Sequence, residues 1–342
     1  MLYLEKTVYL KGSVLDQEID ILKRTNCVTP STVIIDDHFD FELYDDLKGL
    51  LPKNTTVLSD FFFDPVCDDI QPFPAWLAYH DFGPMARVNF SPHDTVDCFN
   101  FIANKARPWR VFVVKLLEYF DLSTKSYTLH PIIDNFHPGR DVGYHGTDKK
   151  IKKFFKWACH NNNLIEEHTP LFLKQDSPNT EHANHWHSFL KSQVFAPAAV
   201  AIITEPYEIT WIDHLTYSEK TIYAMLGLNF PLWAVGGIGQ ADMWKSVGFD
   251  VFDDVIDHSY QYHKDPMERS FYAIYDNLEI LCDLDKAKKL RDQCADRLIA
   301  NQQRVYDGQL DKWLRNKVSG YSITTQKDLE KYMQGLLWNH VG

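Results

Sequence analysis

The chain lacks the features that mark secreted and membrane-spanning proteins. Its six cysteines are scattered without a C-x-x-C pair, which is typical of a reduced, cytoplasmic protein. It does not start with a signal peptide, and no apolar run approaches the roughly 20 residues that a membrane helix needs. We therefore predict a cytoplasmic protein without a membrane partner, as a monomer or a dimer.

The sequence also has few patterns that bind metals or cofactors. It contains no H-E-x-x-H and no obvious D-x-D at a strand end with a companion site. A histidine-rich stretch at residues 181–187 invites a metal interpretation, but a polar, partly exposed helical turn fits its spacing better. The sequence predicts no bound metal and no resident cofactor.

Basic residues are too few for a uniformly basic nucleic-acid binder, because the net charge is −12. A local basic face remains compatible with that charge. A hydrophobic fraction of 45% and an aromatic fraction of 14% are ample for a packed interior. At 342 residues the chain is long for one core and suits two domains or one elaborate domain.

Apolar runs and helical patterns alternate in residues 198–260 as in an open α/β sheet. An apolar run, 199–203, ends at Thr204-Glu205, and a second, 232–235, leads into the glycine-rich turn 236–239. Helices are predicted from Ser218 and over 240–247. In such sheets the ligand binds at the edge where strands end and helices begin.

The same alternation predicts three regions. We expect residues 1–92 to form a small α/β domain, residues 93–283 a second α/β domain, and residues 284–342 a helical tail that braces both lobes. We predict an α/β fold with two facing Rossmann-like domains and this C-terminal tail. The expected strands are 33–35, 55–58, 76–79 and 98–102, and the expected helices are 41–51, 108 onward, 147–160, 266–282, 285–305, 308–318 and 325–338.

Cations stand at the predicted starts of two helices in the second domain. One loop carries Asn104, Arg107 and Arg110, and the other has Lys220 after Ser218 and Glu219. A cation at a helix start is destabilising, because the macrodipole places partial positive charge there. The arrangement becomes favourable if an anion such as a diphosphate lies between the cation and the N–H groups. The alternative is that the arginines are solvated surface charges and that Ser218 simply caps a helix.

These pieces resemble the donor-binding domain of phage-encoded glycosyltransferases, and more distantly the α-1,3-fucosyltransferases. The shared motifs cover about a third of the chain. The matching pieces are Asn104, Arg107-Pro108-Trp109-Arg110, Ser218-Glu219-Lys220-Thr221, Gly248-Phe249-Asp250-Val251-Phe252 and Ile256-Asp257-His258-Ser259-Tyr260. The family often has an acidic residue where this chain has His258.

The resemblance implies a GT-B-like enzyme that takes a sugar from a nucleotide-diphosphate donor, in particular a uridine-diphosphate sugar. The implied acceptor is 5-hydroxymethylcytosine in double-stranded phage DNA, which receives glucose or arabinose. A fucosyltransferase-like enzyme acting on a glycan and a non-catalytic nucleotide-sugar binding protein are the alternatives. The residues implied at the sugar-donor site are Asn104, Arg107, Arg110, Glu205, Ser218, Glu219, Lys220 and Thr221.

The same resemblance assigns roles at this site. Arg107, Arg110 and Lys220 would hold the diphosphate, with Asn104 and Ser218 assisting. Glu219 would bind the ribose and Glu205 would face the sugar.

An inverting enzyme also needs a base on the acceptor hydroxyl. Acidic residues at strand ends of the first domain are the candidates: Asp36, Asp37 and His38, and then Asp81 after His80. The alternative for each is a solvated loop or helix-capping side chain. A further acidic pair, Asp253-Asp254, is expected in a surface turn.

A basic amphipathic helix is predicted at residues 147–160. Lys149, Lys150, Lys153 and Lys156, with Lys152 beside them, are candidates for contacts with DNA phosphates, and an aromatic side chain for an unstacked base. The alternative is a surface helix that packs Ile151, Phe154 and Phe155 inward. Another basic run, at 286–291, is expected to be a solvated helix face.

Overall fold

The computed structural model has a mixed α/β fold that divides into two compact units. One unit joins Met1–Gly83 to Leu310–Gly342, and the other is Pro84–Gln309. The structure describes residues 2–4, 7–11, 15–25, 32–36, 41–59, 70–72, 90–101, 108–122, 144–161, 198–205, 219–310 and 312–313.

The first unit is built on a five-stranded sheet in sequence order, with β1 antiparallel to β2 and the remaining strands parallel. Its elements are β1 (Leu2–Leu4), β2 (Thr7–Lys11), α1 (Leu15–Thr25), β3 (Thr32–Asp36), α2 (Phe41–Leu50), β4 (Thr56–Ser59) and β5 (Ile70–Pro72). Apolar side chains of β3 and α2, such as Val33, Ile35 and Leu47, are fully buried. They form the core that the strand and helix patterns predicted.

The second unit contains a three-stranded parallel sheet in the order β6 (Asp97–Phe101), β7 (Ala198–Thr204), β8 (Phe230–Val235). Every residue of β7 and β8 is buried. Continuous burial is typical of parallel strands covered on both faces. It explains why these strands appear in the sequence as unbroken apolar runs.

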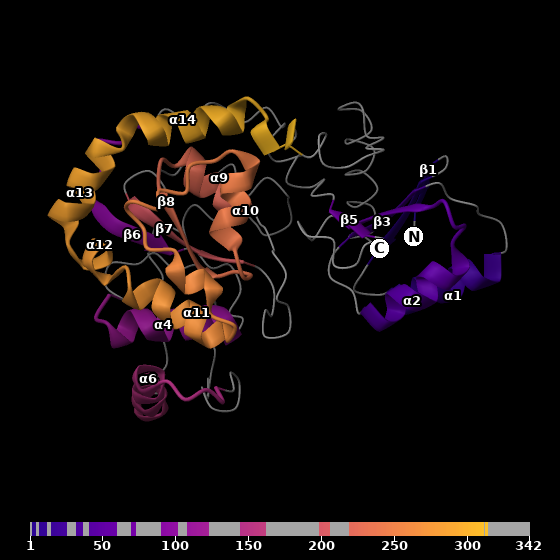
Figure 1. The fold of residues 1–342 in the computed structure, drawn as a ribbon, viewed down its shortest axis with the longest axis horizontal. Helices are drawn as coiled ribbons and strands as arrows, with labels where there is room; N and C mark the ends of the chain where they lie inside the picture. The colour runs from indigo at the N-terminus through magenta and orange to yellow at the C-terminus, as the bar shows by residue number, and fades with distance from the viewer. Residues whose placement is uncertain are drawn as a thin grey trace, which may run out of the picture. The chain divides into compact units, whose positions relative to one another are not determined.

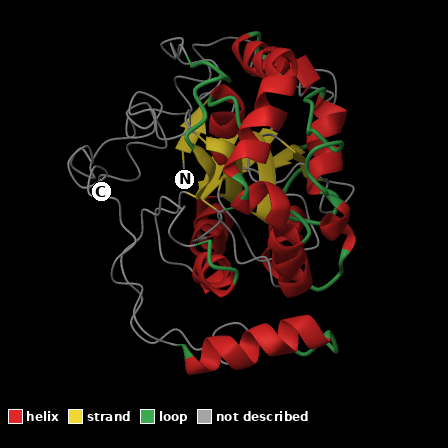
Figure 2. Cartoon of the chain, turned by 90° about the vertical axis from the view of Figure 1, so that its left-hand side faces the viewer, coloured by secondary structure: helices red, strands yellow, loops and turns green. Residues whose placement is uncertain are grey.

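Helices cover both faces of this sheet (Figures 1 and 2). α11 contacts β8 and α4, whereas α13 contacts β6 and β7, and α9 contacts β7, β8 and α14. The helical elements are α4 (Pro108–Tyr119), α6 (Lys149–His160), α9 (Glu219–Leu226), α10 (Gln240–Val247), the 3-10 turn η4 (Ser259–Tyr262), α11 (Pro266–Tyr275), α12 (Leu278–Cys282), α13 (Leu284–Gln293) and α14 (Ala295–Tyr306).

The helices predicted at 266–282 and 285–305 are each interrupted. The first ends at Tyr275. The side chain of Asn277, just beyond it, ties this end to Asp257: its amide donates to Asp257 O and to Ala273 O of α11, both at 3.0 Å, and its oxygen accepts from Asp257 N at 2.9 Å. The second is divided at Cys294 into α13 and α14. The structure gives no physical account of the second break.

The units differ from the predicted regions at both boundaries. The first division falls at Gly83 rather than at residue 92. Residues 284–309 belong to the second unit, where α13 contacts the sheet directly. That a C-terminal tail braces both lobes stays a prediction. The strand predicted at 76–79 and the helix predicted at 325–338 lie outside the described residues.

No helix within the described ranges combines the length and the apolar character needed to cross a membrane.

Candidate functional site

The carboxyl ends of β6, β7 and β8 lie at one edge of the sheet because the three strands are parallel. Glu205 directly follows β7, and its N–H donates to Val235 O at the end of β8, at 3.1 Å. α9 and α10 are the described helices that begin after β7 and β8, and α4 begins after β6. This arrangement places Glu205 at the edge that the sequence predicted for a ligand.

A short hydrogen-bond chain fixes the side chain of Glu205. Thr221 Oγ1 donates to Glu205 Oε1 at 3.2 Å, and Trp233 Nε1 donates to Thr221 Oγ1 at 2.9 Å. All three residues are buried, with Glu205 only 2% exposed. The Thr221 hydroxyl therefore donates its proton to Glu205 and helps to hold the position of that carboxylate.

Two cations on the helices that begin after β6 and β7 are also buried. Lys220, in the first turn of α9, is 7% exposed, and Arg110, in the first turn of α4, is 5% exposed. α4 contacts β8, and α9 contacts both β7 and β8. Lys220 and Arg110, both predicted to bind the diphosphate, and Glu205 thus lie on elements that meet at one edge of the sheet.

The start of α10 is different, because its N–H groups are bonded to neutral amide oxygens. Gly237 N donates to Gln240 Oε1 at 3.2 Å, and Ala241 N donates to Gln261 Oε1 at 2.8 Å. The first turn also carries Asp242, whose carboxylate accepts from Tyr262 at 2.6 Å. The glycine-rich turn before α10 is therefore poorly suited to an anion.

His258 occupies the position where the resembling family often has an acid, and its ring is buried in a structural network. Its Nε2 lies 2.9 Å from Val251 O and its Nδ1 3.3 Å from the Tyr260 hydroxyl. That hydroxyl accepts from Trp233 N at 3.1 Å, which leaves the Tyr260 proton for Nδ1 and assigns the Nε2–H tautomer. Burial lowers the pKa of His258, so the neutral ring is favoured.

The Gly-Phe-Asp-Val-Phe motif at 248–252 is also structural. Gly248, with φ at 105°, ends α10, where a side chain would be strained. The Asp250 carboxylate accepts from Phe252 N at 2.9 Å and from Arg297 at 2.7 and 3.0 Å. Arg297 also binds Asp254 through two hydrogen bonds of 2.8 Å, and these partners raise the pKa of Arg297. The motif anchors the chain after α10 to α14.

The acidic pair at 253–254 is exposed, as predicted, and is held in ion pairs. Lys245 Nζ lies 2.5 Å from Asp253, whose pKa is lowered mainly by this hydrogen bond. Asp254 is bonded to Arg297, which lowers the pKa of that carboxyl as well. Within the described residues, no group of three or more His, Cys, Asp or Glu side chains is placed to hold a metal ion.

Most of the predicted acceptor-side residues fall beyond what the structure describes. Asp36 is the last residue of β3, opposite Lys11 of β2, so it does lie at the end of a parallel strand. Glu219 is the first residue of α9. Outside the described residues lie Asp37, His38, Asp81, Asn104, Arg107, Ser218 and the histidine-rich stretch 181–187.

The predicted basic helix is confirmed as α6, and its aromatic residues face the protein. Phe154 is fully buried, with ring centroids 5.3 Å from Phe112 and 5.4 Å from Tyr119. Phe155 stacks on Tyr144 at 5.6 Å, and Trp157 packs against Tyr119 at 5.2 Å. The apolar side of α6 therefore faces inward, and its rings pack against other rings of the protein. Contact of its lysines with DNA stays a prediction.

Sequence reasoning missed Trp233 as part of the site. It lies inside a buried apolar strand, where nothing in the sequence distinguishes a packed indole from one that donates to a site residue. The amides of Gln240 and Gln261 were also missed, because the sequence does not indicate which N–H groups their oxygens accept from. Comparison of the chain with family models, with curated proteins and with solved structures finds no match.

Proposed function

We propose that the protein is a glycosyltransferase that moves a sugar from a nucleotide-diphosphate donor, in particular a uridine-diphosphate sugar, to an acceptor hydroxyl. The proposed fold is GT-B-like, with two facing Rossmann-like domains, and the second unit holds the sugar donor. The observation that carries the proposal is the buried set Arg110, Glu205 and Lys220 on the elements of one parallel-sheet edge. Parallel sheets bind ligands at that edge.

Charge explains how such a set would act. When the sugar leaves the diphosphate, negative charge grows on the leaving group. Lys220 and Arg110 would stabilise that charge most strongly in the transition state, which is the condition for rate enhancement. Glu205, held by Thr221, would accept hydrogen bonds from sugar hydroxyls. The proton of the acceptor hydroxyl would go to a base of the first unit, for which Asp36, Asp37, His38 and Asp81 are the candidates.

Capping at the two helix starts favours one position for the diphosphate. The start of α10 is taken up by the oxygens of Gln240 and Gln261 and carries Asp242. The start of α9 carries the buried Lys220 next to Glu219, the residue proposed to bind the ribose. We therefore propose that the diphosphate binds between α9 and α4.

The acceptor proposed is 5-hydroxymethylcytosine in double-stranded DNA. The test is transfer of radiolabelled sugar from a uridine-diphosphate donor to hydroxymethylated duplex DNA, with unmodified duplex as the control. We expect label only in the hydroxymethylated duplex, and equal transfer with a metal chelator because Arg110 and Lys220 supply the cations. Label in a glycan alone would favour the fucosyltransferase-like alternative. Nucleotide binding without transfer to any acceptor would favour a binding protein.

A further inference from the structure

The lysines of α6 lie along one exposed stripe of the helix. At about 100° per residue, Lys149, Lys152, Lys153, Lys156 and His160 fall within roughly 100° of arc. All five are exposed, and the helix contains no acidic residue. Ile151, Phe154 and Ala158 lie on the opposite side and are buried. We call the set Lys149, Lys152, Lys153 and Lys156 the lysine stripe.

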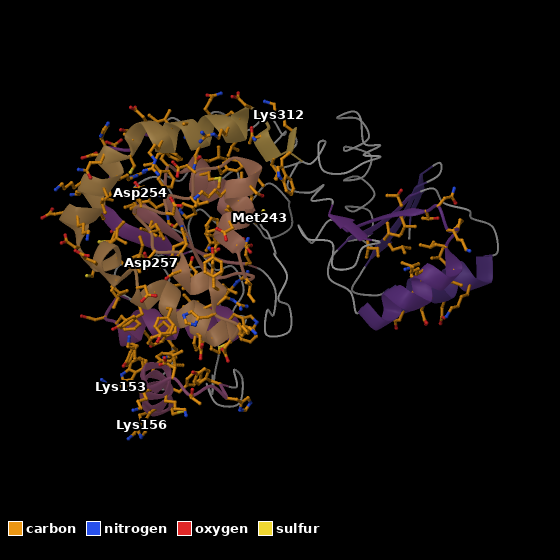
Figure 3. All side chains as sticks on the ribbon, viewed as in Figure 1. Lys153, Lys156, Met243, Asp254, Asp257 and Lys312 are labelled. Atoms are coloured by element: carbon orange, nitrogen blue, oxygen red, sulfur yellow. The ribbon has the colours of Figure 1, made fainter. Side chains whose placement is uncertain are left out.

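The structure separates this stripe from Lys150, which sequence analysis had grouped with it. Lys150 Nζ lies 4.0 Å from the ring centroid of Tyr275 and 5.6 Å from that of Tyr272. Lys150 is thus held against α11 by cation–π contacts. Figure 3 shows Lys153 and Lys156 projecting from α6 away from the rest of this unit.

Hydrogen bonds hold the start of α6 in place. Asp148 caps the helix by accepting from Lys150 N at 2.7 Å and Ile151 N at 3.1 Å, and it also accepts from the Tyr272 hydroxyl at 2.7 Å. Tyr144 donates to Glu268 at 2.9 Å and accepts from Asp148 N at 3.0 Å. Because Glu268 and Tyr272 belong to α11, the stripe is presented by a helix anchored to the body of the unit.

We propose that the lysine stripe binds the phosphate backbone of a nucleic-acid duplex. The stripe and His160 span about 16 Å, a length over which one DNA strand presents about five phosphates. The proposal deepens the proposed function, because it names the surface that would hold the DNA acceptor. Only the biological role of the lysine stripe rests on the proposed function, because binding of a duplex to the stripe needs no sugar donor.

Two other polyanionic partners fit the observations less well. A helix that lies in a membrane interface inserts its apolar face, and here that face is buried against the protein. Binding of single strands relies on aromatic side chains that stack on bases, and the aromatic rings of α6 all pack against other rings of the protein. Of the polyanionic partners considered, a regular duplex fits best, because its backbone can be contacted through charge alone.

The test is fluorescence anisotropy of the full chain with a short labelled DNA duplex at salt concentrations between about 50 and 200 mM. We expect a dissociation constant of roughly 10⁻⁶ to 10⁻⁴ M that weakens steeply with salt. The triple variant Lys152→Ala, Lys153→Ala, Lys156→Ala should bind at least about tenfold more weakly, and its salt slope should fall by about 3.

A matched control is available on α13. The variant Lys286→Ala, Lys288→Ala, Lys289→Ala also removes three positive charges from the chain, at a helix that carries Asp285 and Asp292 as well as the lysines. It should bind like the wild type. Equal weakening of both variants would mean that overall charge alone drives binding, and it would overturn the proposal. Wild-type binding by the α6 variant would overturn it too.

Three further arms complete the test. Replacing the same α6 lysines with arginine should retain binding, and loss there would contradict a role for charge. Tighter binding to single strands or to anionic vesicles than to the duplex would overturn the choice of partner. Thermal stabilisation by uridine diphosphate should persist in the α6 variant, so failure of duplex binding and failure of the sugar-donor site are observed separately.

Discussion

Helices α9 and α10 begin at the same edge of the β6–β7–β8 sheet, and their first turns differ in charge. The first turn of α9 carries Glu219, the buried Lys220 and Thr221, whose hydroxyl donates to Glu205. α10 follows a glycine-rich turn, yet Gln261 takes the N–H of Ala241. A glycine-rich turn before a helix therefore does not by itself leave N–H groups open to an anion. Whether a helix start can bind an anion depends on the partners of its N–H groups and on the nearby charges.

The largest effect is expected from removing the cation on α9. Lys220→Ala should abolish the stabilisation by uridine diphosphate, which for the wild type amounts to about 2.7 kcal/mol at a hundred times the dissociation constant. The control is Lys245→Ala on α10, an exposed lysine that pairs with Asp253. Thermal unfolding with and without nucleotide measures both. Full stabilisation of the Lys220 variant would remove that residue from the site.

Removing the cap of α10 should destabilise the fold without affecting nucleotide binding. Gln261→Ala leaves the buried N–H of Ala241 without its acceptor and should lower the free energy of unfolding by about 1–3 kcal/mol. Gln303→Ala, at an exposed position, should change it by less than about 0.5 kcal/mol. Denaturant unfolding gives both values. If Gln261→Ala weakens nucleotide binding as Lys220→Ala does, the two helix starts do not differ as proposed.

The buried ring of His258 predicts a pH dependence of stability. Its pKa is lowered in the folded state by burial, so the unfolded chain binds the extra proton first as pH falls below about 6.5. The free energy of unfolding should then decrease by up to about 1.4 kcal/mol per pH unit until the folded-state pKa is reached. His258→Gln should remove this component, and His145→Gln, at an exposed position, should not. Identical pH profiles for wild type and His258→Gln would contradict the assignment.

The smallest effect is expected from the bond that positions Thr221. Trp233→Phe keeps an aromatic ring next to His258 but removes the Nε1–H donor to Thr221. A typical hydrogen bond contributes about 0.5–1.5 kcal/mol, so kcat/KM for sugar transfer should fall by at most about tenfold. Steady-state kinetics with a uridine-diphosphate sugar measures the change. Unaltered kcat/KM would mean that this hydrogen bond does not position Glu205 for transfer.

Much of the second unit could be predicted from local sequence patterns. The helix 240–247 has the predicted bounds, and the apolar runs at 199–203 and 232–235 lie within β7 and β8. Each of these elements is specified by its own residues, through a continuous apolar run or helical spacing. In the first unit β1, β2 and α1 were not predicted, because the two strands are short and carry no clear alternation.

Tertiary burial could not be predicted in the same way. Arg291 was expected on a solvated helix face, and it is fully buried. It donates to Leu228 O at 2.9 Å, Thr95 Oγ1 at 2.8 Å and Gly227 O at 3.1 Å, and burial lowers the pKa of its guanidinium to about 10. These acceptors are 63, 196 and 64 residues away in the sequence, so no local pattern indicates them.

The candidate site shows the same division. The strand-end position of Glu205 and the helix-start positions of Lys220 and Arg110 follow from local patterns. The bond between Glu205 and Thr221, and the amides that fill the start of α10, depend on side chains from different elements.

A crystal structure of the protein with uridine diphosphate tests the central proposal most directly. The proposal predicts diphosphate oxygens within hydrogen-bond distance of Lys220 Nζ, at the start of α9. A diphosphate bound instead at the glycine-rich turn before α10, with Gln240 and Gln261 displaced from its N–H groups, would contradict it.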